Sequence, residues 1–126
     1  MSKLFDLQNK NVLLTGASKG MGLAMAQGLA NHGANVVISS RKLDQCQKAI
    51  ETINESIGQE KAFAFSCNAS SKDELNTLVD FSISKLGSIT TLVCNAGVNS
   101  FFGSMSEIDD ESYDKTMDTN VKSNHW

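Results

Sequence analysis

Short apolar runs alternate with longer amphipathic segments along the chain. Runs rich in Val, Leu, Ile or Phe predict strands, and uninterrupted runs fit a sheet that is covered on both faces. Apolar residues that recur every three or four positions predict helices between these strands. The predicted strands are residues 11–15, 35–39, 62–67 and 90–95.

The first two predicted helices span residues 20–32 and 43–57. Both carry apolar residues at helical spacing, and each is followed by a glycine, Gly33 or Gly58, which is typical of a helix C-terminus. The apolar stripe of the first helix consists of Met21, Met25 and Leu29. That of the second consists of Leu43, Cys46, Ile50, Ile53 and Ile57.

Two further helices complete the alternation. The sequence from Ser71 to Glu74 (SKDE) has the form of a capping box, which predicts a helix start there, and Gly87 marks the end of that helix. The last helix is expected to begin at Asp109 or Asp110. Its apolar residues lie four apart and are Tyr113, Met117 and Val121.

Strands that alternate with helices through short connections predict an α/β fold with a parallel sheet and right-handed crossovers. We therefore expect one domain, residues 1–126, with a doubly wound parallel sheet of the Rossmann type that stops after about four strands. In such sheets, ligands bind beyond the carboxyl ends of the strands.

Composition excludes several classes of function. The net charge of −3 argues against a nucleic-acid partner, and no apolar run approaches the roughly 20 residues that cross a membrane. The N-terminal residues contain no apolar signal segment, so we expect a cytoplasmic location. Cys46, Cys67 and Cys94 form no C-x-x-C pair, so we expect neither a disulfide framework nor a metal site.

A glycine-rich segment directly follows the first predicted strand and opens the first helix. It reads TGASKGMG over residues 15–22. Glycines allow a tight turn and close approach to a phosphate, and the helix N-terminus favours an anion. A turn whose glycines serve packing alone is the alternative, but the strand, loop and helix occur in the order that indicates a diphosphate site. A P-loop is excluded because no Gly-Lys-[Ser/Thr] closes the segment.

The end of the second strand indicates which dinucleotide would bind. An NAD site usually has an acid about 20 residues after the glycines, whereas Ser40 and Arg41 stand here. Together with Lys19, Arg41 predicts a site for the 2′-phosphate and a preference for NADP(H) over NAD(H). In the alternative interpretation, Arg41 and Lys42 are solvated residues at a helix start, where acids are more usual than bases.

These motifs resemble those of the short-chain dehydrogenase/reductase family. The TGxxxGxG loop at residues 15–22 is similar to that family's version. Cys94-Asn95-Ala96-Gly97 resembles its Asn-Asn-Ala-Gly block, and the sequence DTNV at residues 118–121 resembles its Asn-Val segment. The resemblance covers essentially the whole chain and is strongest to NADP-dependent carbonyl and retinol reductases.

The resemblance implies roles for individual residues. Asn68, where the family usually has Asp, would contact the adenine edge, and Asn120 would be the member of the catalytic tetrad that holds a proton-relay water. The remaining cofactor-binding residues implied are Gly16, Ser18, Lys19, Gly20, Met21, Gly22, Ser40, Arg41, Asn95, Ala96 and Gly97.

The family's chemistry also requires a Ser, a Tyr and a Lys four residues after the Tyr. Tyr113, the only tyrosine, is followed four residues later by Met117, so we interpret it as a packing residue. We expect the 126 residues alone to be catalytically incompetent, and the fourth strand, near Leu92, to be an exposed edge. The full-length form is expected to be a homo-oligomer that acts on a small carbonyl or alcohol substrate.

Two alternatives to a cofactor-binding half of an oxidoreductase stay open. In the first, the chain is a non-catalytic module that binds NADP or pairs with a longer relative. In the second, it is a fragment with no function of its own.

Overall fold

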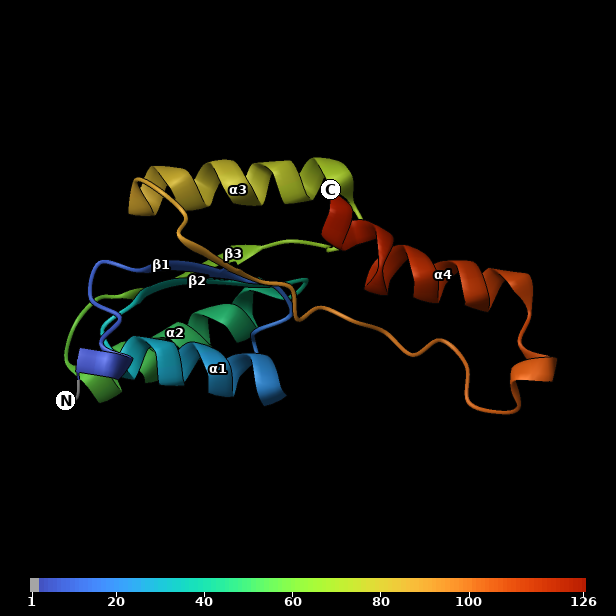
Figure 1. Cartoon of the computed structure of the whole chain (residues 1–126), viewed down its shortest axis with the longest axis horizontal. Coiled ribbons are helices and arrows are strands. Elements are labelled where there is room, and N and C mark those ends of the chain that lie inside the picture. Colours follow the sequence, from blue (N-terminus) through green and yellow to red (C-terminus); the bar gives the residue numbers. More distant parts are fainter. Residues whose placement is uncertain (1–2) are drawn as a thin grey trace.

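The structure is a computed structural model that describes residues 3–126. Strands and helices alternate as the sequence predicts (Figure 1). They are β1 (Asn11–Leu14), α1 (Gly20–Asn31), β2 (Asn35–Ser40), α2 (Leu43–Ile57), β3 (Ala62–Ser66), α3 (Lys72–Leu86), β4 (Thr91–Val93) and α4 (Asp110–Asn120). Three short 3-10 helices are η1 (Lys3–Phe5), η2 (Met105–Glu107) and η3 (Lys122–His125).

All four strands are parallel and lie in the order β3-β2-β1-β4. Figure 1 shows α1 and α2 on one face of the sheet and α3 on the other, while α4 lies beyond the end of the sheet. This arrangement confirms the predicted doubly wound α/β fold. The order reverses at β1, so the carboxyl ends of β1, β2 and β4 surround the place where such folds bind ligands.

Two apolar clusters hold the layers together. The larger joins one face of the sheet to α1 and α2 and includes Leu14, Ile38 and Ile53, all fully buried. The smaller joins the other face to α3 through Leu13 and Leu78. Burial on both faces explains why β1 and β2 consist of nearly uninterrupted apolar residues.

Of the apolar stripe predicted for α1, only Leu29 packs against the core. Met21 is 79% exposed and Met25 38% exposed, whereas the buried residues are Gly22, Ala26 and Ala30. These small side chains let the helix lie close to the sheet, and the longer methionines are displaced to the outer side. The predicted helix is confirmed, but two of its three stripe residues, Met21 and Met25, lie outside the buried face.

Helix α4 is well formed but packs mainly against η3. Asp109 caps it, since its carboxylate accepts a hydrogen bond from the Ser112 N–H at 2.7 Å. The interpretation of Tyr113 as a packing residue is wrong, because its side chain is 48% exposed, and Met117 and Val121 are also exposed. No part of residues 3–126 covers this face of α4.

Strand β4 is shorter than expected and forms one edge of the sheet. Leu92 is 57% exposed, as the prediction of an uncovered fourth strand requires. The strand ends at Val93, and beyond it the backbone N–H groups of Asn95 and Ala96 bond to the side chain of Thr15. Across residues 3–126, no helix is long and apolar enough to cross a membrane.

Candidate functional site

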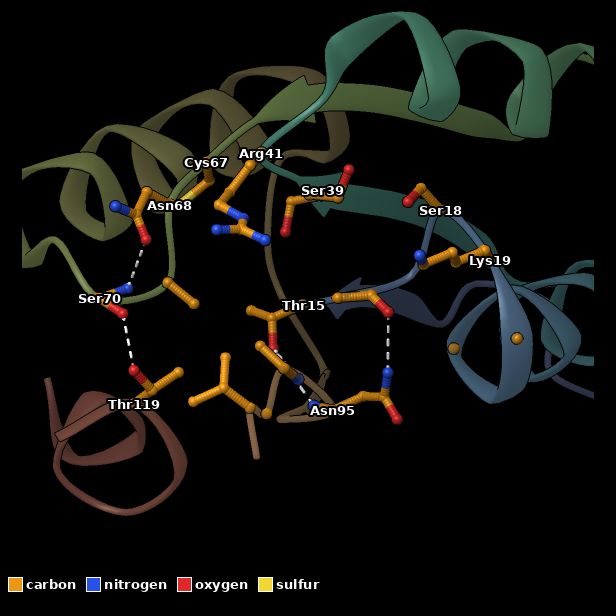
Figure 2. Close-up of a pocket in the computed structure, with 18 of the residues that line it drawn as sticks. Thr15, Ser18, Lys19, Ser39, Arg41, Cys67, Asn68, Ser70, Asn95 and Thr119 are labelled. Carbon is orange, nitrogen blue, oxygen red and sulfur yellow. Dashed lines mark hydrogen bonds between the residues drawn. The ribbon is translucent and has the colours of Figure 1, made fainter. Parts of the chain in front are cut away.

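A cavity of about 820 Å³ opens at the carboxyl ends of the strands (Figure 2). Its volume lies within the roughly 300–1,000 Å³ that is usual for small-molecule sites. Every cofactor-binding residue predicted from the sequence lines it: Gly16, Ser18, Lys19, Gly20, Met21, Gly22, Ser40, Arg41, Asn68, Asn95, Ala96 and Gly97. The remaining lining residues are Thr15, Ser39, Cys67, Ala69, Ser70, Val98, Lys115, Asp118, Thr119 and Trp126.

The glycine-rich loop between β1 and α1 is tied to the segment after β4. The Asn95 side-chain amide donates to the Gly16 carbonyl at 2.8 Å. The Thr15 hydroxyl accepts from the backbone N–H groups of Asn95 at 3.2 Å and Ala96 at 3.1 Å (Figure 2). These bonds join two segments about 80 residues apart and give the loop a fixed shape.

Glycine is required at two positions of this loop. Gly16 has a φ of +61°, and a Cβ there would lie 2.8 Å from the Cα of Ala96. A Cβ on Gly22 would lie 2.5 Å from the Gly16 carbonyl oxygen and 2.6 Å from the Asn95 amide nitrogen. The loop therefore closes on itself only because these side chains are absent.

The N-terminus of α1 faces the cavity without a side-chain cap. Lys19 occupies the N-cap position in extended conformation and makes no capping hydrogen bond. The first N–H groups of a helix need acceptors and carry partial positive charge. An anion in the cavity would satisfy them, and Lys19, which also lines the cavity, would add a full positive charge.

The end of β2 supplies one wall of the cavity. The Ser39 carbonyl accepts from the Ala17 N–H at 3.0 Å, which fixes β2 against the glycine-rich loop. The Ser40 hydroxyl is already used locally, since it accepts from the Lys42 N–H at 3.3 Å and lies 3.1 Å from the Cys46 sulfur. Arg41 is exposed and makes no ion pair with any residue between 3 and 126.

The loop after β3 supplies the neighbouring wall. Asn68 is held at both ends: its backbone N–H donates to the Glu74 carboxylate at 2.6 Å, and its side-chain oxygen accepts from the Ser70 N–H at 3.0 Å. The expected capping box at the start of α3 is therefore modified. Ser71 caps Glu74 N–H as predicted, but the Glu74 carboxylate bonds to Asn68 and not back to Ser71.

Cys67 lines the cavity as a thiol. Burial, and secondarily the negative charge of Glu74, raises the pKa of Cys67 to about 11. Because only the thiolate reacts and binds metals, this cysteine is inert at neutral pH. Among residues 3–126, no group of three side chains is arranged to hold a metal ion.

Asn120 is the one predicted site residue that does not line the cavity. Its side chain accepts from the Val98 N–H at 2.7 Å and donates to the Val98 carbonyl at 2.8 Å. Its own carbonyl accepts from the Asn124 side chain at 2.9 Å. Asn120 thus anchors α4 to the segment after β4.

Sequence reasoning missed the contribution of α4 and of the C-terminal residues. The Thr119 hydroxyl is nearly buried and lies 2.8 Å from the Ser70 hydroxyl, which joins α4 to the loop after β3 (Figure 2). Lys115 and Trp126 also line the cavity. Thr119 lies within the DTNV motif, but no local pattern marks Lys115 or Trp126, because their place depends on how α4 folds back from a distant segment.

The cavity fits a dinucleotide. It combines an uncapped helix N-terminus, a loop that a Cβ would obstruct, and the side chains of Lys19, Arg41 and Lys115 against one acid, Asp118. These features favour a ligand with negative charge at one side and uncharged polar groups elsewhere.

Comparison with known proteins identifies the family of this chain. The family model "short chain dehydrogenase" matches residues 10–126. "Dehydrogenase/reductase SDR family member 4" of Caenorhabditis elegans is 39% identical over 115 residues, which are 91% of this chain and 44% of that protein. The chain thus spans less than half the length of this curated relative.

Two solved structures are similar as well. A short-chain type dehydrogenase/reductase from Mycobacterium marinum has a TM-score of 0.88 and 34% identity, over 98% of this chain and 49% of that one. The 3-ketoacyl-(acyl-carrier-protein) reductase from Brucella melitensis was solved in complex with NADH. It has a TM-score of 0.86 and 28% identity, over 95% of this chain and 47% of that one. The chain therefore belongs to the short-chain dehydrogenase family.

Proposed function

We propose that this chain is the cofactor-binding half of an NADP(H)-dependent short-chain oxidoreductase. The dinucleotide, when bound, supplies or accepts a hydride, and the substrate of the full-length form is a small carbonyl compound or alcohol. Gly16, Ser18 and the N-terminus of α1 would bind the diphosphate, and Asn95 to Gly97 would line the ribose. The Brucella relative was solved with NADH, so the preference for NADP(H) rests on this chain's own residues.

The observation that carries the preference is Arg41. It lies at the carboxyl end of β2, lines the cavity, and has no acidic partner between residues 3 and 126. A carboxylate at this edge would bind the ribose 2′-OH of NAD, whereas an arginine suits a 2′-phosphate. Ser40 lines the same part of the cavity, and its hydroxyl accepts from the Lys42 N–H at 3.3 Å.

Catalysis needs residues that the sequence does not contain. Residues 1–126 include Asn120 but no Tyr followed four residues later by Lys. Loss of positioned acid/base catalysis typically costs about 10²–10⁴ in rate. We therefore propose that residues 1–126 bind the cofactor without turning it over, so NADPH absorbance should persist when an activated dicarbonyl is added.

The test is isothermal titration of residues 1–126 with NADPH and with NADH. We expect NADPH to bind about 10–1,000-fold more tightly, since each hydrogen bond to a charged group contributes roughly 1.5–3 kcal/mol before ordering costs. Arg41→Ala should remove most of this preference. Lys42→Ala is the matched control, because this neighbouring cation does not line the cavity. Equal affinity of the wild-type chain for the two dinucleotides would overturn the preference.

A partner-binding role is the second candidate. The exposed edge of β4, with Leu92 uncovered, favours it, because an unpaired strand edge is a ready template for another chain. In such a role, the chain would bind a longer relative. The full-length form is separately expected to be a homo-oligomer. Size-exclusion chromatography with and without that relative distinguishes a binding module from an isolated cofactor domain. The cytoplasmic location stays a prediction from the sequence.

A further inference from the structure

Helix α4 turns one polar face toward the cavity. Lys115 lies three positions before Asp118 and four before Thr119, so the three side chains share one side of the helix, and all three line the cavity. The exposed apolar residues Tyr113 and Met117 lie on the other side. A helix that lies beyond the end of the sheet therefore brings a cation to the cavity wall.

The acid on this face of α4 does not neutralise Lys115. The Asp118 carboxylate pairs instead with the Lys122 amine, at 3.9 Å. Among residues 3–126, Lys115 forms no ion pair, and its side chain is exposed. The positive charge of Lys115 is therefore available to a ligand in the cavity.

Polar contacts hold Lys115 at the cavity. One turn after it, the buried Thr119 hydroxyl lies 2.8 Å from the Ser70 hydroxyl. Next to Thr119, the Asn120 side chain bonds to both polar backbone groups of Val98. These contacts fix the C-terminal half of α4, and Lys115 is the cation one turn away from them.

The segment after β3 connects this part of α4 to Arg41. At the end of β3, the Ser66 hydroxyl donates to the Arg41 carbonyl at 3.3 Å. Four positions later, the Ser70 hydroxyl contacts Thr119. Because this connection is so short, Arg41 and the cavity face of α4 border the same end of the cavity.

The glycine-rich loop borders the other end. Figure 2 shows Ser70 and Thr119 across the cavity from Lys19. The uncapped N-terminus of α1 lies beside Lys19 and suits the diphosphate of a dinucleotide. Lys115 therefore lies at the end of Arg41, away from the expected diphosphate position.

The charge of a 2′-phosphate calls for more than one cation. A phosphate monoester carries a charge of about −1.5 to −2 at pH 7, so one guanidinium balances only part of it. Lys115 and Arg41 are the two cations at this end of the cavity among residues 3–126. A lysine amine, as a point charge with three donors on a flexible stem, can reach a phosphate without a fixed geometry.

We propose that Lys115 is a specificity-determining residue that binds the 2′-phosphate of NADP(H) together with Arg41. Helix α4 then contributes to the choice between the two dinucleotides. Ser70 and Thr119 act as positioning residues, because their contact holds α4 at the cavity. This inference rests on the proposed dinucleotide site.

The experiment is isothermal titration of Lys115→Gln with NADPH and with NADH. Glutamine removes the charge at an exposed position, so the fold is kept, which circular dichroism checks. We expect the dissociation constant of NADPH to rise about three- to tenfold, the range between an exposed ion pair and a charge-assisted hydrogen bond. That of NADH, which has no 2′-phosphate, should change less than about twofold.

Lys72→Gln is the matched control for a general effect of charge. Lys72 is also exposed and opens α3 near the loop after β3, but it does not line the cavity. Its removal changes the net charge by the same amount. The preference for NADPH in this variant should equal that of the wild type.

Ser70→Ala tests the positioning role. It should weaken NADPH binding in the wild-type chain and have little further effect in Lys115→Gln, because it acts through the position of Lys115. Ser106→Ala is its control, since the Ser106 hydroxyl lies 2.8 Å from that of Ser104 but outside the cavity. Equal losses from Ser70→Ala in both backgrounds would overturn the positioning role.

The outcomes separate this inference from the proposed function. A Lys115→Gln variant that keeps the wild-type preference for NADPH would overturn the inference and leave the dinucleotide site intact. Equal losses for NADPH and NADH would also overturn it, because Lys115 would then act on a group that both dinucleotides share. Failure of both dinucleotides to bind the wild-type chain would overturn the proposed function itself.

Discussion

Replacing Gly22 by alanine should disrupt the glycine-rich loop and with it the cavity. The new Cβ would lie 2.5 Å from the Gly16 carbonyl oxygen, 2.6 Å from the Asn95 amide nitrogen and 2.7 Å from the Cα of Ala17. Two of these atoms are backbone, and the third belongs to the side chain that bonds the loop to the segment after β4. The two backbone atoms cannot move aside as a side chain could, so the loop itself must shift.

The size of the effect follows from two contributions. Inserting a methyl group into a closely packed place costs about 1–3 kcal/mol, and losing the hydrogen bond from Asn95 to Gly16 costs about 1 kcal/mol more. The free energy of unfolding should therefore fall by about 2–4 kcal/mol. For a domain of this size, that lowers the melting temperature by roughly 6–20 °C.

Gly28→Ala is the control for helix propensity. Gly28 lies in the same helix, and a Cβ there would meet nothing within 4 Å. In a helix interior, alanine is more stable than glycine by about 0.5–1 kcal/mol, so this variant should be slightly more stable than the wild type. Urea unfolding followed by circular dichroism measures both variants. Equal stability of Gly22→Ala and Gly28→Ala would refute the reasoning.

Three further predictions concern Asn120 and the cysteines. Asn120→Ala leaves both polar backbone groups of Val98 without their partner and should lower the free energy of unfolding by about 1–2 kcal/mol. Hydrogen exchange at the Val98 amide should become faster. Unchanged exchange there would contradict the anchoring role of Asn120. Burial, and secondarily Glu74, raises the pKa of Cys67 from the ordinary value of 9.0 to about 11, so the folded chain holds this proton more tightly than the unfolded chain. The resulting stability is complete below pH 9 and is lost as the pH rises to 11, a loss that Cys67→Ala should abolish in urea unfolding curves. At pH 8 the exposed Cys94 should be alkylated well before Cys67, and equal labelling rates would contradict the raised pKa.

Local patterns predicted most of the fold. The glycines after α2 and α3, the Ser71 cap and the uninterrupted apolar strands each act within a few residues, so the sequence identifies them directly. The glycine-rich loop was predictable for the same reason. The strand, the turn and the helix that carry its glycines are consecutive in the chain, whereas its contacts with Asn95 and Ala96 come from a distant segment.

Contacts between distant segments were not predictable in this way. The apolar stripe of α1 contains Met21, but the sheet buries the adjacent row of small residues, which begins at Gly22. The hydrogen bond between Ser70 and Thr119 joins residues 49 apart, and neither position shows a pattern by itself. The exposed face of α4, with Tyr113, has an amphipathic pattern but no partner within residues 3–126.

The central claim is that the cavity at the carboxyl ends of the strands binds NADP(H). Amide hydrogen exchange of residues 1–126, measured with and without saturating NADPH, tests it most directly. We predict slower exchange in residues 16–22 and 95–98, and unchanged exchange along α3, which lies on a face of the sheet away from the glycine-rich loop (Figure 1). Unchanged exchange in the glycine-rich loop at saturating NADPH would contradict the account.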